Sequence, residues 1–210
     1  EYNLQQAIAN KIKVGVYFFS TAVSTQEAVE EADWVADLIA PYQITYPVAY
    51  NCEGFQNADS RQNGLDTATR TTIADAFLKE IYQKGYTPMF YAAKNEMENN
   101  VLWDMTKLSS SYKVWVSQYP DSPYPQTARS SYTGTHAMWQ YSNNATVPGI
   151  TKPTDVNIAY FGYADVAAAK SQETPQTASA SVEALMNFSS VNETVTVERC
   201  TIFGGSFRYF

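Results

Sequence analysis

Residues 46–55 read Tyr46-Pro47-Val48-Ala49-Tyr50-Asn51-Cys52-Glu53-Gly54-Phe55, an apolar run that ends in an amide, a thiol and a carboxylate. The run predicts a buried strand that stops at a site. Because side chains alternate along a strand, Asn51 and Glu53 are expected on one side and Cys52 on the other. Barrels of the α/β class place their chemistry at the carboxyl ends of such strands. The structural alternative is that Glu53 caps the following turn or pairs with Arg61.

Composition restricts the partners of the chain. Its 210 residues are 45% hydrophobic and 17% charged, which is enough for one domain with a substantial core plus an appendage. The net charge of −7 argues against nucleic acid and against an anionic membrane surface, because both require clustered Lys and Arg. A neutral or zwitterionic substrate fits better. The 16 Tyr, 10 Phe and 4 Trp residues can fill a core or form flat platforms for sugar rings.

No cofactor is expected. The two cysteines, Cys52 and Cys200, are too few for a disulfide framework, and their spacing matches no metal site, so both are predicted to be free thiols. The one histidine, His136, begins a predicted strand at the end away from the active face, which favours a structural role. No apolar run approaches the ~18 residues of a membrane span. Since Glu1 is not a natural start, we expect the chain to be a piece of a longer protein.

Strand and helix signals alternate in the first half of the chain. Residues 13–20 predict a strand, and Ser24-Thr25-Gln26-Glu27 is a capping box that opens a helix closed by Pro41. Asp66 or Thr67 caps a second helix, which Gly85 ends. Further apolar runs predict strands at 87–91, 113–119, 136–141 and 155–160.

These runs lack strict alternation, which is typical of parallel strands buried on both faces. We therefore expect an α/β fold, an irregular TIM-like (β/α) barrel whose later helices are short or missing. Composition shifts near Tyr163, so we assign 1–163 to the barrel domain and the Ala-, Ser-, Thr-, Gln- and Pro-rich stretch 164–182 to a linker. Residues 183–210 are too few for a core of their own.

The strand series resembles the glycoside hydrolase family 25 lysozymes, which cleave the glycan of bacterial peptidoglycan. The matching pieces occur in the family's order across about residues 5–163. They are Val14-Gly15-Val16-Tyr17-Phe18, the strand from Pro47 to Glu53, Pro88-Met89-Phe90-Tyr91, Val114-Trp115-Val116-Ser117-Gln118-Tyr119, Met138-Trp139-Gln140-Tyr141-Ser142, Val147-Pro148-Gly149-Ile150 and Asp155-Val156-Asn157. Residues 188–195 resemble the opening of a bacterial SH3-like wall-binding module.

The resemblance implies a secreted or wall-associated muramidase that cleaves the β-1,4 bond between N-acetylmuramic acid and N-acetylglucosamine. Peptidoglycan glycan strands are the implied partner. It also implies that Glu53 is the general acid and Asp155 a second acidic site residue. Two features depart from the family. Its strand motif is Asp-x-Glu where this chain has Asn51, and this chain begins after the place where the first two strands should be.

Asn51 changes the expected chemistry. Most glycosidases use two carboxyl groups, and Asn51 cannot be the second one. A substrate with a 2-acetamido group can supply its own nucleophile, in which case the protein needs only a group that orients the amide, as an Asn side chain can. Two functions stay open at this point: a substrate-assisted muramidase and a catalytically inactive module that binds cell-wall glycan.

Seven side chains at predicted strand ends are candidates for lining a glycan cleft, with core packing as the alternative. They are Tyr17, Tyr91, Trp115, Gln118, Tyr119, Trp139 and Tyr141.

The missing strands predict two open barrel edges, one along 14–19 and one along 156–161. Exposed edges of this kind are pairing sites. We expect them to be covered by the 183–210 tail, by a second copy of the chain in a homo-oligomer, or by the missing strands of a longer protein.

Overall fold

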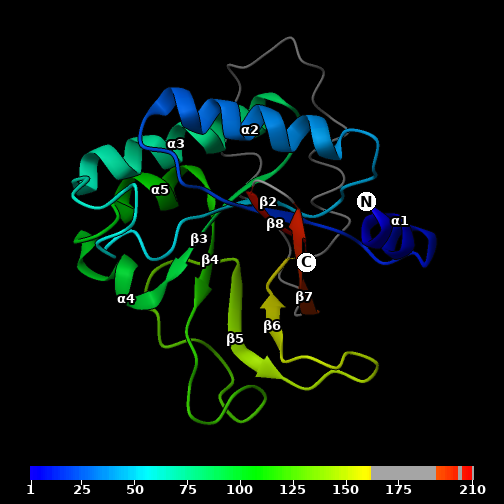
Figure 1. Cartoon of the computed structure of the whole chain (residues 1–210). Helices are drawn as coiled ribbons and strands as arrows, with labels where there is room; N and C mark the ends of the chain where they lie inside the picture. The colour runs from blue at the N-terminus through cyan, green and yellow to red at the C-terminus, as the bar shows by residue number, and fades with distance from the viewer. Residues whose placement is uncertain (162–192, 203–204, 210) are drawn as a thin grey trace.

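The computed structural model describes residues 1–161, 193–202 and 205–209, with side chains within 1–161 apart from residue 99. Its strands, within those ranges, form one curled sheet that closes in the order β1 to β8 (Figure 1). Their bounds are β1 Val16–Phe19, β2 Val48–Asn51, β3 Pro88–Ala93, β4 Lys113–Ser117, β5 Met138–Ala145, β6 Thr154–Ala159, β7 Glu193–Ile202 and β8 Gly205–Tyr209.

Strands β1 to β5 are neighbours in chain order and pair in parallel. Their carboxyl ends therefore meet at one rim, which holds the end of β2 at Asn51 beside Tyr91 of β3. Helices separate the first four strands, because a parallel neighbour needs a crossover connection. The sequence predicts those between β1 and β3, but not the short helices between β3 and β4.

The expectation that all strands are parallel is wrong for β6, which pairs antiparallel to β5. Residues 146–153 between them contain a turn in which Ile150 N donates to Val147 O at 3.0 Å, and Gly149 has φ of +89°. A parallel return needs a dozen or more residues, so this short turn can only reverse the chain.

Strands β7 and β8 pair with each other and with the two sides of the six-stranded sheet. β7 lies antiparallel to β6 and β8 antiparallel to β1, with Val16 opposite Tyr209. Both edges that we expected to be open are thus paired with strands of the tail. The expected linker, 164–182, lies outside the described residues, and the division into domains stays a prediction.

The helices are α1 Tyr2–Ala9, α2 Thr25–Ile39, α3 Thr67–Gln83, α4 Lys94–Met97 and α5 Met105–Ser111, with a 3-10 turn at Glu98–Asn100. Helices α2 and α3 begin where their caps predict. Ser24 Oγ accepts from Glu27 N at 3.2 Å, and Asp66 Oδ1 accepts from Thr69 N at 2.6 Å. Within the described part of the chain, no helix has the length and apolar character needed to cross a membrane.

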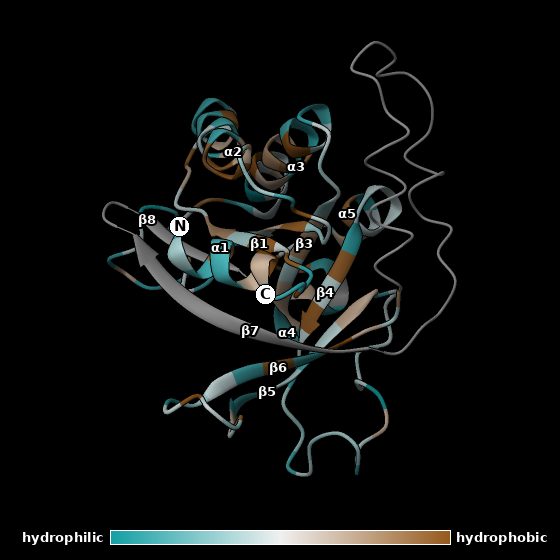
Figure 2. Ribbon diagram, turned by 90° about the vertical axis from the view of Figure 1, so that its right-hand side faces the viewer, coloured by the Kyte–Doolittle hydropathy of each residue, from teal (hydrophilic) through white to brown (hydrophobic). Residues whose placement is uncertain are grey.

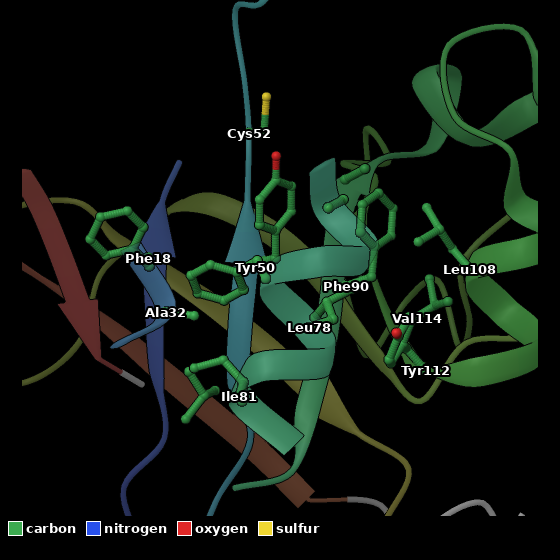
Figure 3. Packing of buried hydrophobic residues seen from close by; sticks show 14 of the residues in the cluster. Phe18, Ala32, Tyr50, Cys52, Leu78, Ile81, Phe90, Leu108, Tyr112 and Val114 are labelled. Atoms are coloured by element: carbon green, nitrogen blue, oxygen red, sulfur yellow. The ribbon is translucent and has the colours of Figure 1, made fainter. Parts of the chain in front are cut away.

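Two apolar clusters lie on opposite sides of the strands. Helices α2 and α3 lie side by side over the first strands, whereas β5 and β6 lie at the far end of the sheet from them (Figures 1 and 2). Outward side chains such as Phe18, Tyr50 and Phe90 pack against Leu78 and other residues of these helices (Figure 3). We call this layer the helix side. The interior side holds Tyr17, Tyr46, Ala49, Met89, Tyr91, Trp115, Met138, Ala159 and Phe161.

Candidate active site

A pocket opens from the interior side at the carboxyl ends of the parallel strands. Asn51 and Glu53 both line it, whereas Cys52 between them is buried on the helix side, as strand alternation predicts. Its full lining is Tyr17, Asn51, Glu53, Tyr91, Trp115, Tyr119, Gln140, Asn143 and Asp155.

Asn51 and Glu53 contact each other at the rim. Asn51 is only 3% exposed, and its Nδ2 donates to Glu53 Oε2 at 3.3 Å. Its Oδ1 is buried and has no hydrogen-bond partner among the described residues, although a buried acceptor is costly to leave unpaired. Glu53 itself is exposed. Arg61, the alternative partner suggested by the sequence, instead pairs with Glu27 at 3.0 Å. The Glu53 carboxylate lines the pocket.

Two tyrosines converge on one amide oxygen beside Glu53. Tyr91 OH donates to Gln140 Oε1 at 2.9 Å and lies 3.5 Å from Glu53 Oε1. Tyr119 OH also donates to Gln140 Oε1, at 2.5 Å. Burial raises the pKa of Tyr91 well above its usual value, and the negative charge of Glu53 adds to this. Burial, followed by the charge of Asp155, raises the pKa of Tyr119 to about 12. Both hydroxyls are therefore neutral at physiological pH.

Aromatic rings form the inner wall of the pocket. Trp115 stands edge-on to Tyr91, with 4.7 Å between ring centroids, and to Tyr17, with 6.2 Å. Its Nε1 donates to Asn157 Oδ1 at 2.9 Å, which fixes the indole. Asp155, two residues before Asn157 on β6, is partly buried and reaches the pocket from the same side of its strand. Among the described residues, no three His, Cys, Asp or Glu side chains are grouped to hold a metal ion.

A family model described as glycosyl hydrolases family 25 matches residues 1–150. The chain belongs to this family. A search of curated proteins found no match.

Solved structures show the same fold as this family 25 chain. The modular autolysin LytC from Streptococcus pneumoniae is 22% identical with a TM-score of 0.59, over 74% of this chain and 36% of LytC. The spore cortex lytic enzyme SleM from Clostridium perfringens is 17% identical with a TM-score of 0.59, over 74% of this chain and 52% of SleM. The catalytic domain of endolysin ply40, from bacteriophage P40 of Listeria monocytogenes, is 15% identical with a TM-score of 0.61, over 82% and 78%. The chain thus spans between a third and about half of the length of LytC and SleM.

Four of the seven expected glycan-lining residues meet in the family 25 pocket, namely Tyr17, Tyr91, Trp115 and Tyr119. The other three lie outside its lining. Gln118 Oε1 accepts from Ser130 Oγ at 3.1 Å, and its backbone oxygen accepts from Trp139 Nε1 at 2.7 Å. Trp139 is fully buried on the helix side, and Tyr141 packs on Tyr124 with 5.6 Å between ring centroids. Their roles stay predictions.

Sequence reasoning missed Gln140 and Asn143, which do line the pocket. Strand alternation is the signal that finds Gln140, because Trp139 and Gln140 are neighbours and cannot both face inward. Asn143 follows a register shift in β5 between Gln140 and Ser142, so simple alternation does not place it. His136 lies between Tyr132 and Tyr160, and its Nδ1 is 2.9 Å from Gly134 O, contacts that suit a structural residue.

A second carboxyl group, Glu96, lies behind the pocket rim and was also missed. It belongs to α4, directly after β3, and its Oε2 accepts from Ala93 N at 3.4 Å. Burial raises the pKa of Glu96 to about 7, and the negative charge of Glu53 contributes to this rise. Glu96 does not line the pocket. Its proton therefore responds to Glu53 without direct access to a ligand there.

Proposed function

We propose that this family 25 domain is a peptidoglycan hydrolase that cleaves the β-1,4 bond between N-acetylmuramic acid and N-acetylglucosamine. The observation that carries the proposal is the exposed Glu53 carboxylate at the rim of an aromatic, polar pocket, with the Asn51 amide in contact. Three of the solved structures of this fold are described as an autolysin, an endolysin and a spore cortex lytic enzyme, which supports a cell-wall substrate. A secreted or wall-associated location follows from that substrate.

In the proposed mechanism, Glu53 is the general acid that protonates the glycosidic oxygen as the bond breaks. The 2-acetamido oxygen of the substrate attacks the anomeric carbon and forms a cyclic intermediate. The Asn51 side chain, which lines the pocket, hydrogen-bonds the acetamido group and aligns that oxygen. Glu53, now ionised, then takes a proton from the water that opens the intermediate. The negative charge of Asp155 stabilises the positive charge that develops on the sugar ring.

The test is hydrolysis of purified bacterial walls, followed by loss of turbidity and release of reducing ends. Glu53→Gln should lower the rate at least about a thousandfold, because a carboxamide is not acidic enough to transfer a proton to the leaving oxygen. Its melting temperature should stay close to that of the parent, since the side chain is exposed. Glu30→Gln, an exposed glutamate on α2, is the matched control and should retain full activity. Full activity of Glu53→Gln would contradict the proposed role.

Asn51 favours one second candidate, a module that binds cell-wall glycan without cutting it. The amide that stands in place of the expected carboxylate donates a hydrogen bond to Glu53 but supplies no negative charge to the reaction. Glycan binding with no release of reducing ends, unchanged by Glu53→Gln, identifies this function.

For the barrel itself, we propose a TIM-like architecture in which residues 193–209 cover the edges of β1 and β6. The antiparallel pairing of β7 with β6 and of β8 with β1 supports this. An uncovered edge leaves backbone groups unpaired at about 1–3 kcal/mol for each buried group. A chain ending at residue 163 should therefore melt at lower temperature and self-associate in light scattering, while the 210-residue chain stays monodisperse. Equal behaviour of both chains would contradict the edge-covering role and leave the wall-binding module as the alternative.

A further inference from the structure

Gln140 receives both tyrosyl hydroxyl protons of the pocket. Tyr91 OH and Tyr119 OH approach Gln140 Oε1 at 2.9 and 2.5 Å. The shorter separation suits an O–H···O hydrogen bond and is below the usual range for N–H···O, which assigns the amide oxygen to this position. Two donors on one carbonyl oxygen use both of its lone pairs.

The orientation of Tyr91 follows from this assignment. A phenolic hydroxyl has one proton to donate, and Tyr91 OH has two acceptors in reach, Gln140 Oε1 at 2.9 Å and Glu53 Oε1 at 3.5 Å, so we assign the proton to the nearer acceptor. The Tyr91 oxygen then presents its lone pairs to Glu53 Oε1 at 3.5 Å. An acceptor in that place favours a proton on Glu53, whereas a donor would favour the bare carboxylate.

We propose that Gln140 is a positioning residue that holds the Tyr91 hydroxyl as an acceptor toward Glu53 and so keeps the acid proton on that carboxyl. Gln140 acts through Tyr91 and needs no contact with substrate. The proposal deepens the proposed function, because the proton retained on Glu53 is the one that the general acid delivers.

Other charged and titratable groups around Glu53 set the background for this effect. Tyr119 and Asp155 line the same pocket, and the charge of Glu53 reaches Glu96 on α4. Asn51 Nδ2 donates to the other carboxylate oxygen and favours the ionised form. The hydrogen bond from Tyr91 to Gln140 has the opposite effect on Glu53, because it leaves Tyr91 as an acceptor and so favours the protonated carboxyl. It therefore offsets the effect of the Asn51 donor.

The experiment follows the side-chain carboxyl carbon signal of Glu53 by NMR across pH in the full chain. Gln140→Met keeps the length of the side chain and removes the acceptor, so Tyr91 turns its proton toward Glu53. The midpoint of the Glu53 signal should fall by about one pH unit, as expected for one added hydrogen bond to a carboxylate. In the Tyr91→Phe background, adding Gln140→Met should leave the Glu53 midpoint of the Tyr91→Phe variant unchanged, since there is no hydroxyl left to turn.

Gln62→Met is the matched control. Gln62 is 2% exposed on the helix side, where its Oε1 accepts from Cys52 Sγ and its Nε2 donates to Ala22 O. This variant loses two buried hydrogen bonds and some stability but should leave the Glu53 midpoint unchanged. An unchanged or higher midpoint in Gln140→Met overturns the proposal.

The NMR result does not depend on catalysis, so the two proposals fail separately. If walls are cleaved, the basic limb of the pH profile in Gln140→Met should move to lower pH by the same amount as the NMR midpoint. If the midpoint falls but neither the parent nor any variant cleaves walls, the positioning role of Gln140 is supported and the hydrolase function is overturned.

Discussion

The two sides of strands β1 to β4 bury similar aromatic rings but treat polar atoms differently. On the helix side, Phe18, Tyr50 and Phe90 pack against the helices (Figure 3). A polar pair on this side, Cys52 with Gln62, is buried and hydrogen-bonded. On the interior side, Tyr91 and Trp115 carry hydrogen bonds that lead toward the pocket. The helix side therefore contributes chiefly stability. On the interior side, the buried rings also orient the polar groups of the pocket.

The largest expected effect removes a ring from the helix side. Phe77 is fully buried, with ring centroids 5.9 Å from Phe18 and 5.4 Å from Tyr50. Phe77→Ala should lower the free energy of unfolding by about 3–5 kcal/mol through lost burial and a residual cavity. Chemical denaturation measures this, with Phe77→Leu as a control that should lose less. Well below its melting temperature, the Phe77→Ala variant should keep its activity per folded molecule, and a selective loss of activity would show that the two sides are coupled.

Sequence patterns located the first half of this fold well. The cap at Asp66 depends only on nearby residues. The same is true of Asn51 and Glu53, which face the same side because they are two residues apart on one strand, so the sequence contains the information needed to place them. The antiparallel direction of β6 depends on the short turn that precedes it. An apolar run by itself does not indicate whether a strand is parallel or antiparallel. Trp139 is the pocket candidate that the sequence suggests because it is aromatic, and so sequence reasoning missed that the neighbouring Gln140 faces the pocket.

The next largest effect tests the charge of the interior side. Asn51→Asp replaces a donor to Glu53 with an anion, which should stabilise the acetamido intermediate and raise kcat/KM about tenfold, equal to about 1.4 kcal/mol. The basic limb of the pH profile should move to higher pH, because a neighbouring negative charge disfavours loss of the acid proton. Wall hydrolysis across pH measures both. A variant with neither change would show that Asn51 does not act on the reacting group.

A smaller effect concerns Glu96 on α4, directly after β3. Because burial raises its pKa from 4.5 to about 7, the folded state binds this proton more tightly than the unfolded state. The stability it supplies is complete below about pH 4.5 and is lost as the pH rises through about 7. Glu96→Gln keeps an acceptor for Ala93 N and should be more stable than the parent at pH 8 by about 1 kcal/mol, after allowance for partial exposure.

As a control, Glu96→Gln and the parent are compared at pH 4, where Glu96 is protonated. The difference in their free energy of unfolding should vanish there. Urea unfolding at the two pH values provides the measurement. A constant difference across pH would mean that packing, and not ionisation, separates the variant from the parent.

The smallest effect lies in the thiol of the helix side. Cys52 is 1% exposed and donates to Gln62 Oε1, and burial raises its pKa to about 12. The thiolate is the reactive form, so at pH 8 iodoacetamide should modify Cys52 only through opening of the structure. Peptide mass spectrometry that follows the Cys52 peptide should show slow labelling in the parent and faster labelling in Phe77→Ala, by the factor by which the population of the open form rises. Equal labelling rates in the two proteins would mean that Cys52 is reached without unfolding, and that the helix side is less closed than its packing indicates.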